Sequence, residues 1–455
     1  MRDTDKKILF GAGTLAIGAF IAKVIGALYR IPLTNILGSE GLGIYQTVFP
    51  AYAVLLDFSG AGAPNALAKI ISGRNTGRTE FAENTLECGK SFFGKIGLIC
   101  SLLLIACAYP FASLQGNPDA VLSYVFLSPA VFFAGLTAVY RGYFQGRLDM
   151  RPTAVSQVIE QLAKLLVGLL LVKIFSFSLP LAVGGATLGV TVSEIIAYLF
   201  LLVKYKRSRR LLGITFTGDK SAYPQIKKEI IKYALPVTLL SLTSPLSSFI
   251  DSFTVVNVIG RYSTEAISLF GLYSGTATTI INLPVSLCYG FSAIAVPSVS
   301  GAGTEEERKK RSDAVMLLTM LFALPCAIGT AVFADKVVGI IFPRLSSTEK
   351  DVTVFLIKIL SANVVFLSLL QTENAVLVGK GKAYIPLVTT LVCVAIKTAL
   401  GIILMSNPYF NVFGIAIATI ACYFIASLVN LIIISGFGIK YGNSLGKNRQ
   451  CDGEG

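Results

Sequence analysis

The chain alternates between long apolar runs and short polar segments, a pattern typical of a protein that crosses a membrane many times. A helix needs about 20 consecutive, mainly apolar residues to cross the hydrocarbon core of a bilayer. The sequence therefore predicts an all-α polytopic membrane protein with about twelve transmembrane helices. The predicted spans are 8–34, 43–68, 91–110, 120–140, 153–176, 180–204, 231–257, 264–298, 314–333, 352–378, 384–405 and 411–434.

Two of these spans contain residues that interrupt a helix. The stretch 57–64 (DFSGAGAP) breaks span 43–68, and Leu283-Pro284 lies inside span 264–298. Such breaks are tolerated in a membrane where the freed backbone groups are buried or line a cavity. We therefore expect both spans to be long and interrupted.

Lysine and arginine are distributed unevenly between the two sides of this topology. With twelve spans, the side that carries both termini holds 27 Lys and Arg residues, and the opposite side holds four. Cytoplasmic loops of membrane proteins carry the excess of Lys and Arg. The pattern predicts a multi-pass protein of the bacterial cytoplasmic membrane with a cytoplasmic N-terminus and a cytoplasmic C-terminus.

The second half of the chain repeats landmarks of the first half. Repeats of six plus six helices occur in secondary transporters, where two lobes move around a site near the bilayer midplane. We expect an N-terminal lobe (1–206), a basic cytoplasmic connector (207–228), a C-terminal lobe (229–434) and a cytoplasmic tail (435–455). The matching landmarks are residues 34–38 with 256–260, Pro152 with Pro386, and Lys164 with Lys397.

Composition excludes several classes of protein. Hydrophobic residues make up 54% of the chain and charged residues 14%, far from a soluble domain. The chain has no His, and no two of its eight Cys have CxxC spacing, so we expect no metal site. The net charge of +14 would suit a nucleic-acid-binding protein, but no basic segment is interleaved with aromatic residues. We expect no nucleic-acid partner.

Ionisable residues inside the spans are the candidates for function, because a charge at the centre of a membrane helix is costly. Lys23 and Arg30 share a helix face, and span 153–176 carries a polar stripe at spacings of three and four. We expect a hydrophilic cavity between the lobes whose cations hold an anionic group. The cavity candidates are Arg30, Lys23, Gln157, Glu160, Lys164 and Lys397, and the candidates for ion coupling are Asp57, Asp251 and Glu373.

Four stretches carry a family resemblance: 26–33, 37–45, 140–146 (YRGYFQG) and 156–161 (SQVIEQ). Together they resemble the stage V sporulation protein B and polysaccharide-transporter branch of the multidrug/oligosaccharidyl-lipid/polysaccharide exporter superfamily, which includes lipid II flippases. The resemblance covers roughly residues 8–434. It implies a V-shaped pair of six-helix lobes, like that of multidrug and toxin extrusion transporters, and alternating access. It also implies transfer of an undecaprenyl-pyrophosphate-linked saccharide between leaflets, with Arg30 lining the cavity.

The sequence departs from this family at two points. Lipid II flippases carry further Arg on their second and eighth spans, whereas this chain has no basic residue between Ile44 and Lys69 and has Thr279 in the eighth span. Many members also have two additional C-terminal helices, and this chain has twelve predicted spans. Both departures weaken a specific assignment to lipid II and leave the lipid-linked saccharide interpretation intact.

Two alternatives stay open. One is a cation-coupled multidrug antiporter, in which Asp57, Asp251 and Glu373 would couple ions. The other is an integral membrane glycosyltransferase or ligase, which the short outer loops and the absence of His disfavour. We expect a transporter rather than an enzyme, acting as a monomer with the lipid bilayer and a lipid-linked saccharide as partners. No cofactor is expected, and Na⁺, a proton gradient or the membrane potential could supply the energy.

Overall fold

The computed structural model describes residues 3–73, 78–211 and 222–435, and every regular element in these residues is a helix. The all-α prediction is confirmed. The tail 435–455 and the centre of the connector 207–228 lie outside the described residues, except at their edges. The elements are α1 (Asp3–Gly60), α2 (Ala63–Ser72), α3 (Arg78–Ala106), α4 (Ala108–Leu114), η1 (Pro118–Ala120), α5 (Val121–Gly146), α6 (Arg151–Ile174), α7 (Leu179–Leu211), α8 (Tyr223–Ser241), α9 (Thr243–Ile259), α10 (Ala266–Phe270), η2 (Gly271–Ala277), α11 (Thr278–Ser300), α12 (Glu305–Val332), α13 (Ala334–Ile341), α14 (Ser347–Leu360), α15 (Ala362–Gly379), α16 (Tyr384–Met405) and α17 (Phe413–Ser435).

Helix α1 consists of two helices joined at Gly38. A straight helix of its 58 residues would be roughly 87 Å long, about three times the thickness of the hydrocarbon core. Gly38 has φ 71° and ψ −174°, a conformation that is essentially restricted to glycine. Before Gly38, the chain runs parallel to α6, because Gly18 packs on Ala154 and Gly26 packs on Gln161.

After Gly38, α1 follows α5 instead. The Gln115 side chain, just before α5, donates to the carbonyl of Thr47 at 3.0 Å, and Ser59 lies 3.5 Å from the carbonyl of Val131 inside α5. Since α5 and α6 are consecutive helices joined by residues 147–150, the two parts of α1 run in opposite directions. The glycine therefore reverses the chain between the first two predicted spans.

Ten helices of the described residues are long and apolar enough to cross a membrane, or eleven if the bent pair α8 and α9 forms one span. The bend between α8 and α9 is 41°. This count treats α1 and α2 together as one span (13–72), although α1 reverses at Gly38. The figure of twelve spans stays a prediction.

The two predicted interruptions have different outcomes. Residues 61–62 separate α1 from α2, so the break expected at 57–64 is present. The break expected at Leu283-Pro284 was wrong, because Pro284 lies inside the continuous helix α11. The irregular turn is the π-helical segment η2, where Gly271 and Gly275 pack against α1 so closely that a Cβ would lie about 2.5 Å or less from Ser39 and Leu42. Close approach to α1 therefore sets the position of the irregular turn.

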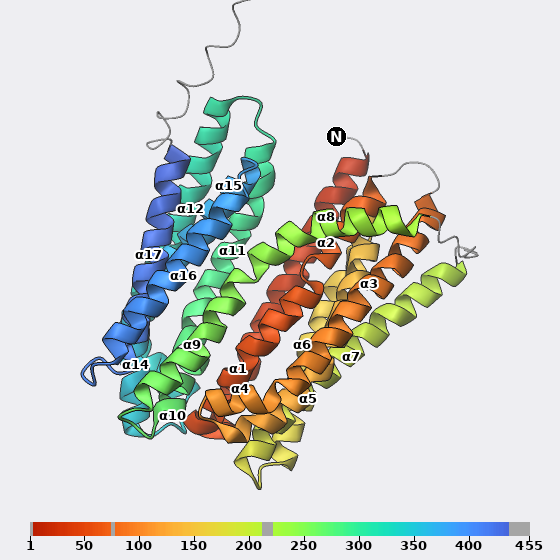
Figure 1. The fold of residues 1–455 in the computed structure, drawn as a ribbon. Helices are drawn as coiled ribbons and strands as arrows, with labels where there is room; N and C mark the ends of the chain where they lie inside the picture. The colour runs from red at the N-terminus through yellow and green to blue at the C-terminus, as the bar shows by residue number, and fades with distance from the viewer. Residues whose placement is uncertain (1–2, 74–77, 212–221, 436–455) are drawn as a thin grey trace, which may run out of the picture.

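The helices form two bundles that converge at one end in a V shape (Figure 1). One bundle contains α1–α7, and the other contains α9–α17. Helix α8 precedes α9 in the chain but lies across the first bundle, where its Ile226, Ile230 and Ala234 are buried with residues of α2, α3 and α5. The connection between α8 and α9 thus passes from one bundle to the other.

Polar contacts join the bundles where they converge. Asn35 donates to the carbonyl of Ile341 at 3.0 Å and accepts from Arg344 at 3.0 Å. Gln46 donates to Ser274 at 3.2 Å. Asn35, Gln46 and Arg344 lie near the ends of predicted spans, and the charge pattern places these span ends on the outer side of the membrane. The structure is therefore closed at the end that we predict to face outward.

Candidate functional site

A cavity of about 870 Å³ lies between the two bundles. Helix α1 contributes Lys23 and Arg30, and α6 contributes Gln161 and Lys164. The opposite wall comes mainly from α11 and includes Thr279. Among the described residues that line the cavity, three are cationic and none is a carboxylate. An anionic ligand is the charge complement of this arrangement.

Arg30 reaches from one bundle to the other. Its Nη1 donates to Oγ1 of Thr279 at 2.7 Å, and the side chain is half-buried in the wall of the cavity. Thr34, one turn further along α1, donates back to the Arg30 carbonyl at 2.8 Å. A guanidinium has five N–H donors in a planar fork that matches carboxylate or phosphate oxygens. Because Thr279 takes one donor, several others can turn to a ligand.

Lys164 is held by aromatic rings rather than by an anion. Its Nζ lies 5.3 Å from the ring centre of Tyr29 and 4.9 Å from that of Phe49. Lys164 forms no hydrogen bond or ion pair with another residue in the part of the chain that the structure describes. Aromatic faces attract a cation but do not neutralise it. Lys164 therefore makes no direct ion pair beside Arg30, and the carboxylates of Glu160 and Glu194 attract its charge without contacting it.

Lys23 lies at the more exposed part of the same cavity. Its Nζ is 4.2 Å from the ring centre of Tyr289 on α11, so this contact also bridges the two bundles. Lys23, Arg30 and Lys164 were candidates from the sequence, and the structure places all three around one cavity.

Gln157 and Glu160 do not line this cavity, although they share the polar stripe of α6 with Lys164. Glu160 accepts from Nη2 of Arg141 on α5 at 2.8 Å and from Gln161 at 2.9 Å. Both side chains of the Arg141–Glu160 ion pair are only 16% exposed. Gln157 has a buried amide oxygen without a hydrogen-bond partner among the described residues. Glu160 therefore pairs directly with a cation of the neighbouring helix and attracts Lys164 without contacting it.

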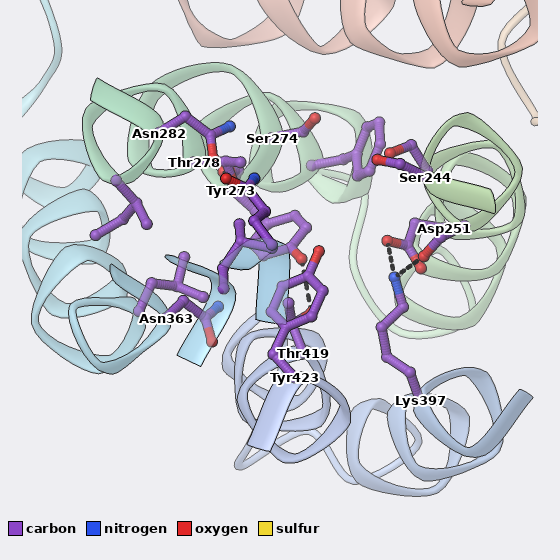
Figure 2. Close-up of a pocket in the computed structure, with 17 residues that line it drawn as sticks. Ser244, Asp251, Tyr273, Ser274, Thr278, Asn282, Asn363, Lys397, Thr419 and Tyr423 are labelled. Carbon is purple, nitrogen blue, oxygen red and sulfur yellow. Dashed lines mark hydrogen bonds and ion pairs between the residues drawn. The ribbon is translucent and has the colours of Figure 1, made fainter. Parts of the chain in front are cut away.

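Lys397 lies in a second, smaller pocket of about 240 Å³ inside the C-terminal bundle (Figure 2). Its Nζ is 2.6 Å from Oδ2 of Asp251 and 2.6 Å from Oγ of Ser247. The side chains of Lys397 and Asp251 are 4% and 8% exposed. This buried ion pair compensates the charge of each partner. Lys397 therefore differs from the three cavity cations both in its pocket and in having a carboxylate partner.

The remaining ion-coupling candidates lie apart from one another. Asp57 is half-buried on α1, close to Ser241 at the end of α8. Glu373 on α15 is fully buried and accepts from Ser427 on α17 at 2.7 Å, while its second carboxylate oxygen has no partner among the described residues. The described residues contain no group of three His, Cys, Asp or Glu that could hold a metal ion.

The polar lining of the second pocket was missed by sequence reasoning. Ser244, Ser247 and Ser248 on α9 line it, together with Asn363 on α15 and Gln371 about two helical turns further on. A signal was present, because residues 241–248 (SLTSPLSS) place five hydroxyls in a predicted membrane span. Sequence reasoning followed the charged residues and did not interpret this neutral run.

A model of the family described as "Polysaccharide biosynthesis protein" matches residues 8–300, more than half of the chain. The chain belongs to this family. Two relatives come from Bacillus subtilis (strain 168). The lipid II flippase MurJ is 27% identical, covering 96% of this chain and 84% of its own length. Stage V sporulation protein B is 24% identical, covering 94% and 84%.

Solved structures of transporters share the fold of this family member. An inward-facing multidrug resistance MATE family transporter of the MOP superfamily has a TM-score of 0.75 at 17% identity, covering 91% of this chain and 95% of its own. Lipid II flippase MurJ in an inward closed conformation has a TM-score of 0.72 at 14% identity, covering 92% and 87%. The predicted resemblance to polysaccharide transporters is confirmed by the family match, and the MATE-like fold is confirmed by the solved structures. The chain is a multi-pass membrane protein.

Proposed function

We propose that this protein is a flippase that moves an undecaprenyl-pyrophosphate-linked saccharide, a precursor of cell wall or polysaccharide, across the cytoplasmic membrane. The observation that carries the proposal is the cavity between the bundles, in which Lys23, Arg30 and Lys164 meet no carboxylate among the described lining residues. The relatives named as a lipid II flippase and a sporulation protein support it. They also favour a transporter over the glycosyltransferase alternative.

In this mechanism, the pyrophosphate enters the cavity from the cytoplasmic side, and the lipid tail stays in the bilayer. Arg30 and Lys164 form charge-assisted hydrogen bonds to the phosphate oxygens, and these bonds replace part of the hydration that the headgroup loses. The two bundles then rock about their contact end. Binding energy drives this change only as far as the two states differ in their affinity for the substrate.

The proposal includes an orientation and an assembly state. The open end of the V faces the cytoplasm, together with both termini, and the contact end near Asn35 and Arg344 faces outward. The protein acts as a monomer and has no nucleic-acid partner. Na⁺, a proton gradient or the membrane potential supplies the energy.

A cation-coupled multidrug antiporter is the second candidate. The fully buried Glu373, with one carboxylate oxygen that has no partner among the described residues, is the observation that favours it, because such a group could bind a proton or cation. Against it, Lys397 already compensates Asp251, and the main cavity presents cations to its ligand. A cationic drug would meet repulsion there, so the flippase is the better-supported function.

The test is transport in proteoliposomes. A fluorescent undecaprenyl-pyrophosphoryl saccharide is placed in both leaflets, and its exposure to a membrane-impermeant quencher is followed over time. Arg30→Ala should lower the rate at least tenfold, because it removes the guanidinium that faces the phosphate oxygens. Lys173→Ala is the matched control, since it removes an exposed cation from the end of α6 without touching the cavity.

Normal transport by Arg30→Ala, in protein that elutes as a single folded species, would remove Arg30 from the mechanism. A wild-type rate no higher than that of empty liposomes would reject the flippase. Drug efflux under a Na⁺ or proton gradient would then identify the antiporter.

A further inference from the structure

The second pocket is neutral and polar, in contrast to the cationic cavity. Hydroxyl and amide side chains line it from α9, α11, α15 and α17, and Figure 2 shows Ser244, Asn363 and Thr419 around the same space. Tyr273 and Tyr423 add aromatic rings to this lining. Because Lys397 compensates Asp251, the pocket presents hydrogen-bonding groups without a strong net charge.

Three buried oxygens on residues that line this pocket have no hydrogen-bond partner among the described residues. They are Oδ1 of Asp251, Oδ1 of Asn363 and Oε1 of Gln371, all buried atoms of residues that line the pocket. Asp251 is 6% exposed and Asn363 is 3% exposed. A buried acceptor without a donor costs free energy, and native proteins rarely leave several unsatisfied in one place. A ligand that offers several donors would therefore satisfy these oxygens.

The pocket adjoins the site proposed for the pyrophosphate. Asn282 and Gln371 line both the pocket and the cationic cavity. Consecutive residues of α11 also face the two spaces, because Thr278 lines the pocket and Thr279 contacts Arg30 in the cavity. A ligand group that is covalently attached to a pyrophosphate at Arg30 would therefore lie next to this pocket.

We infer that the pocket binds the sugar that is joined directly to the pyrophosphate, an inference that rests on the proposed flippase function. Sugar hydroxyl and acetamido groups would donate to the three unpaired oxygens, and the hydroxyls of the lining would donate in turn. A metal cation fits less well, because the Lys397 ammonium lies 2.6 Å from the other oxygen of Asp251 and repels a second positive charge. The site thus divides into a cationic part for phosphate and a neutral part for saccharide.

The test compares two lipids in the full-length purified protein. One probe is undecaprenyl pyrophosphate that carries N-acetylglucosamine, and the other is undecaprenyl pyrophosphate without sugar. Asn363→Leu should raise the Kd of the sugar-bearing probe on the order of five- to tenfold, the effect of one or two lost neutral hydrogen bonds. The Kd of the sugar-free probe should change less than twofold. Arg30→Ala should raise both values.

Thr398→Val is the matched control, because the Thr398 hydroxyl bonds only to the carbonyl of Val394 in its own helix among the described residues. If Asn363→Leu does not fold, Gln371→Met provides the same test. An equal change for both probes, or no change for either, would overturn the sugar site. Removal of Na⁺ is the remaining comparison. If it weakens lipid binding by wild type as much as Asn363→Leu does, and weakens binding by that variant no further, the pocket binds a cation instead.

These outcomes are separable from failure of the proposed function. If wild type binds neither lipid, the flippase proposal itself fails, and if Arg30→Ala leaves both Kd values unchanged, Arg30 is removed from the mechanism. If wild type binds both lipids equally and Arg30→Ala weakens both, the flippase proposal survives and the sugar site is rejected.

Discussion

The buried ion pair between Asp251 and Lys397 predicts strong coupling between two residues that lie far apart in the sequence. The Nζ–Oδ2 distance is 2.6 Å, and both side chains are more than 90% buried. At an effective dielectric constant of 20, the attraction is about 6 kcal/mol. Desolvation of both ions offsets most of it, so the net value of the pair is small, whereas leaving either ion alone is costly.

We therefore expect Lys397→Met and Asp251→Asn to lower the free energy of unfolding by about 3–5 kcal/mol each. The double variant, which buries no charge at this position, should lose only about 0–2 kcal/mol. The coupling free energy between the two positions would then be about 4 kcal/mol or more. Denaturant titration in mixed micelles, followed by far-ultraviolet circular dichroism, measures these values without Trp, which the chain lacks.

A second ion pair provides the control. Lys358 contacts Asp335 at 2.8 Å, but the two side chains are 45% and 65% exposed. Water screens such a pair, so Lys358→Met should cost less than about 1 kcal/mol, and its double variant with Asp335→Asn should show little coupling. If the Asp251 and Lys397 variants are additive, or if each costs no more than Lys358→Met, the reasoning that the buried pair compensates two otherwise unpaired charges is refuted.

Two further predictions concern the cavity and the contact between the bundles. Lys164→Met should weaken binding of undecaprenyl pyrophosphate at least tenfold, measured by titration, while Lys164→Arg should retain most of the affinity. Equal affinities for the two variants would show that the charge at position 164 does not contribute to binding. Gly43→Val should open the contact end, because a Cβ at Gly43 would lie 2.1 Å from the Ile267 carbonyl. Faster labelling of a cysteine introduced at Asn35 measures this opening, and an unchanged labelling rate would contradict it.

The sequence predicts the helical elements well because their signal is local. Apolar runs of membrane length need no tertiary information, and the chain reversal at Gly38 lies between two such runs. Pro284 shows the limit of local signals, since α11 continues through it. The irregular turn lies instead at Gly271 and Gly275, where another helix must approach closely. The close approach of two helices is a property of the packed structure, so the positions of prolines in the sequence do not predict it.

Charge partners were predictable only in part, because they come from helices that are distant in sequence. The spacing of Lys23 and Arg30 places them on one face, and the structure has both at the cavity. The polar stripe of span 153–176 places Glu160 and Lys164 on one face, but Glu160 pairs with Arg141 on the neighbouring helix. Lys397, at the repeat position of Lys164, pairs across 146 residues, which no local pattern shows.

These pairings explain why a substrate would promote the movement of the two bundles. The cations that face carboxylates, such as Arg141, are compensated before any ligand binds. Arg30 and Lys164 contact only a hydroxyl and aromatic rings among the described residues, and Glu160 and Glu194 attract Lys164 without contacting it. Closing an empty cavity would bury these two positive charges without a contacting anion, at a cost of several kcal/mol. A bound pyrophosphate removes this penalty, so the closed state becomes accessible mainly when the cavity is loaded.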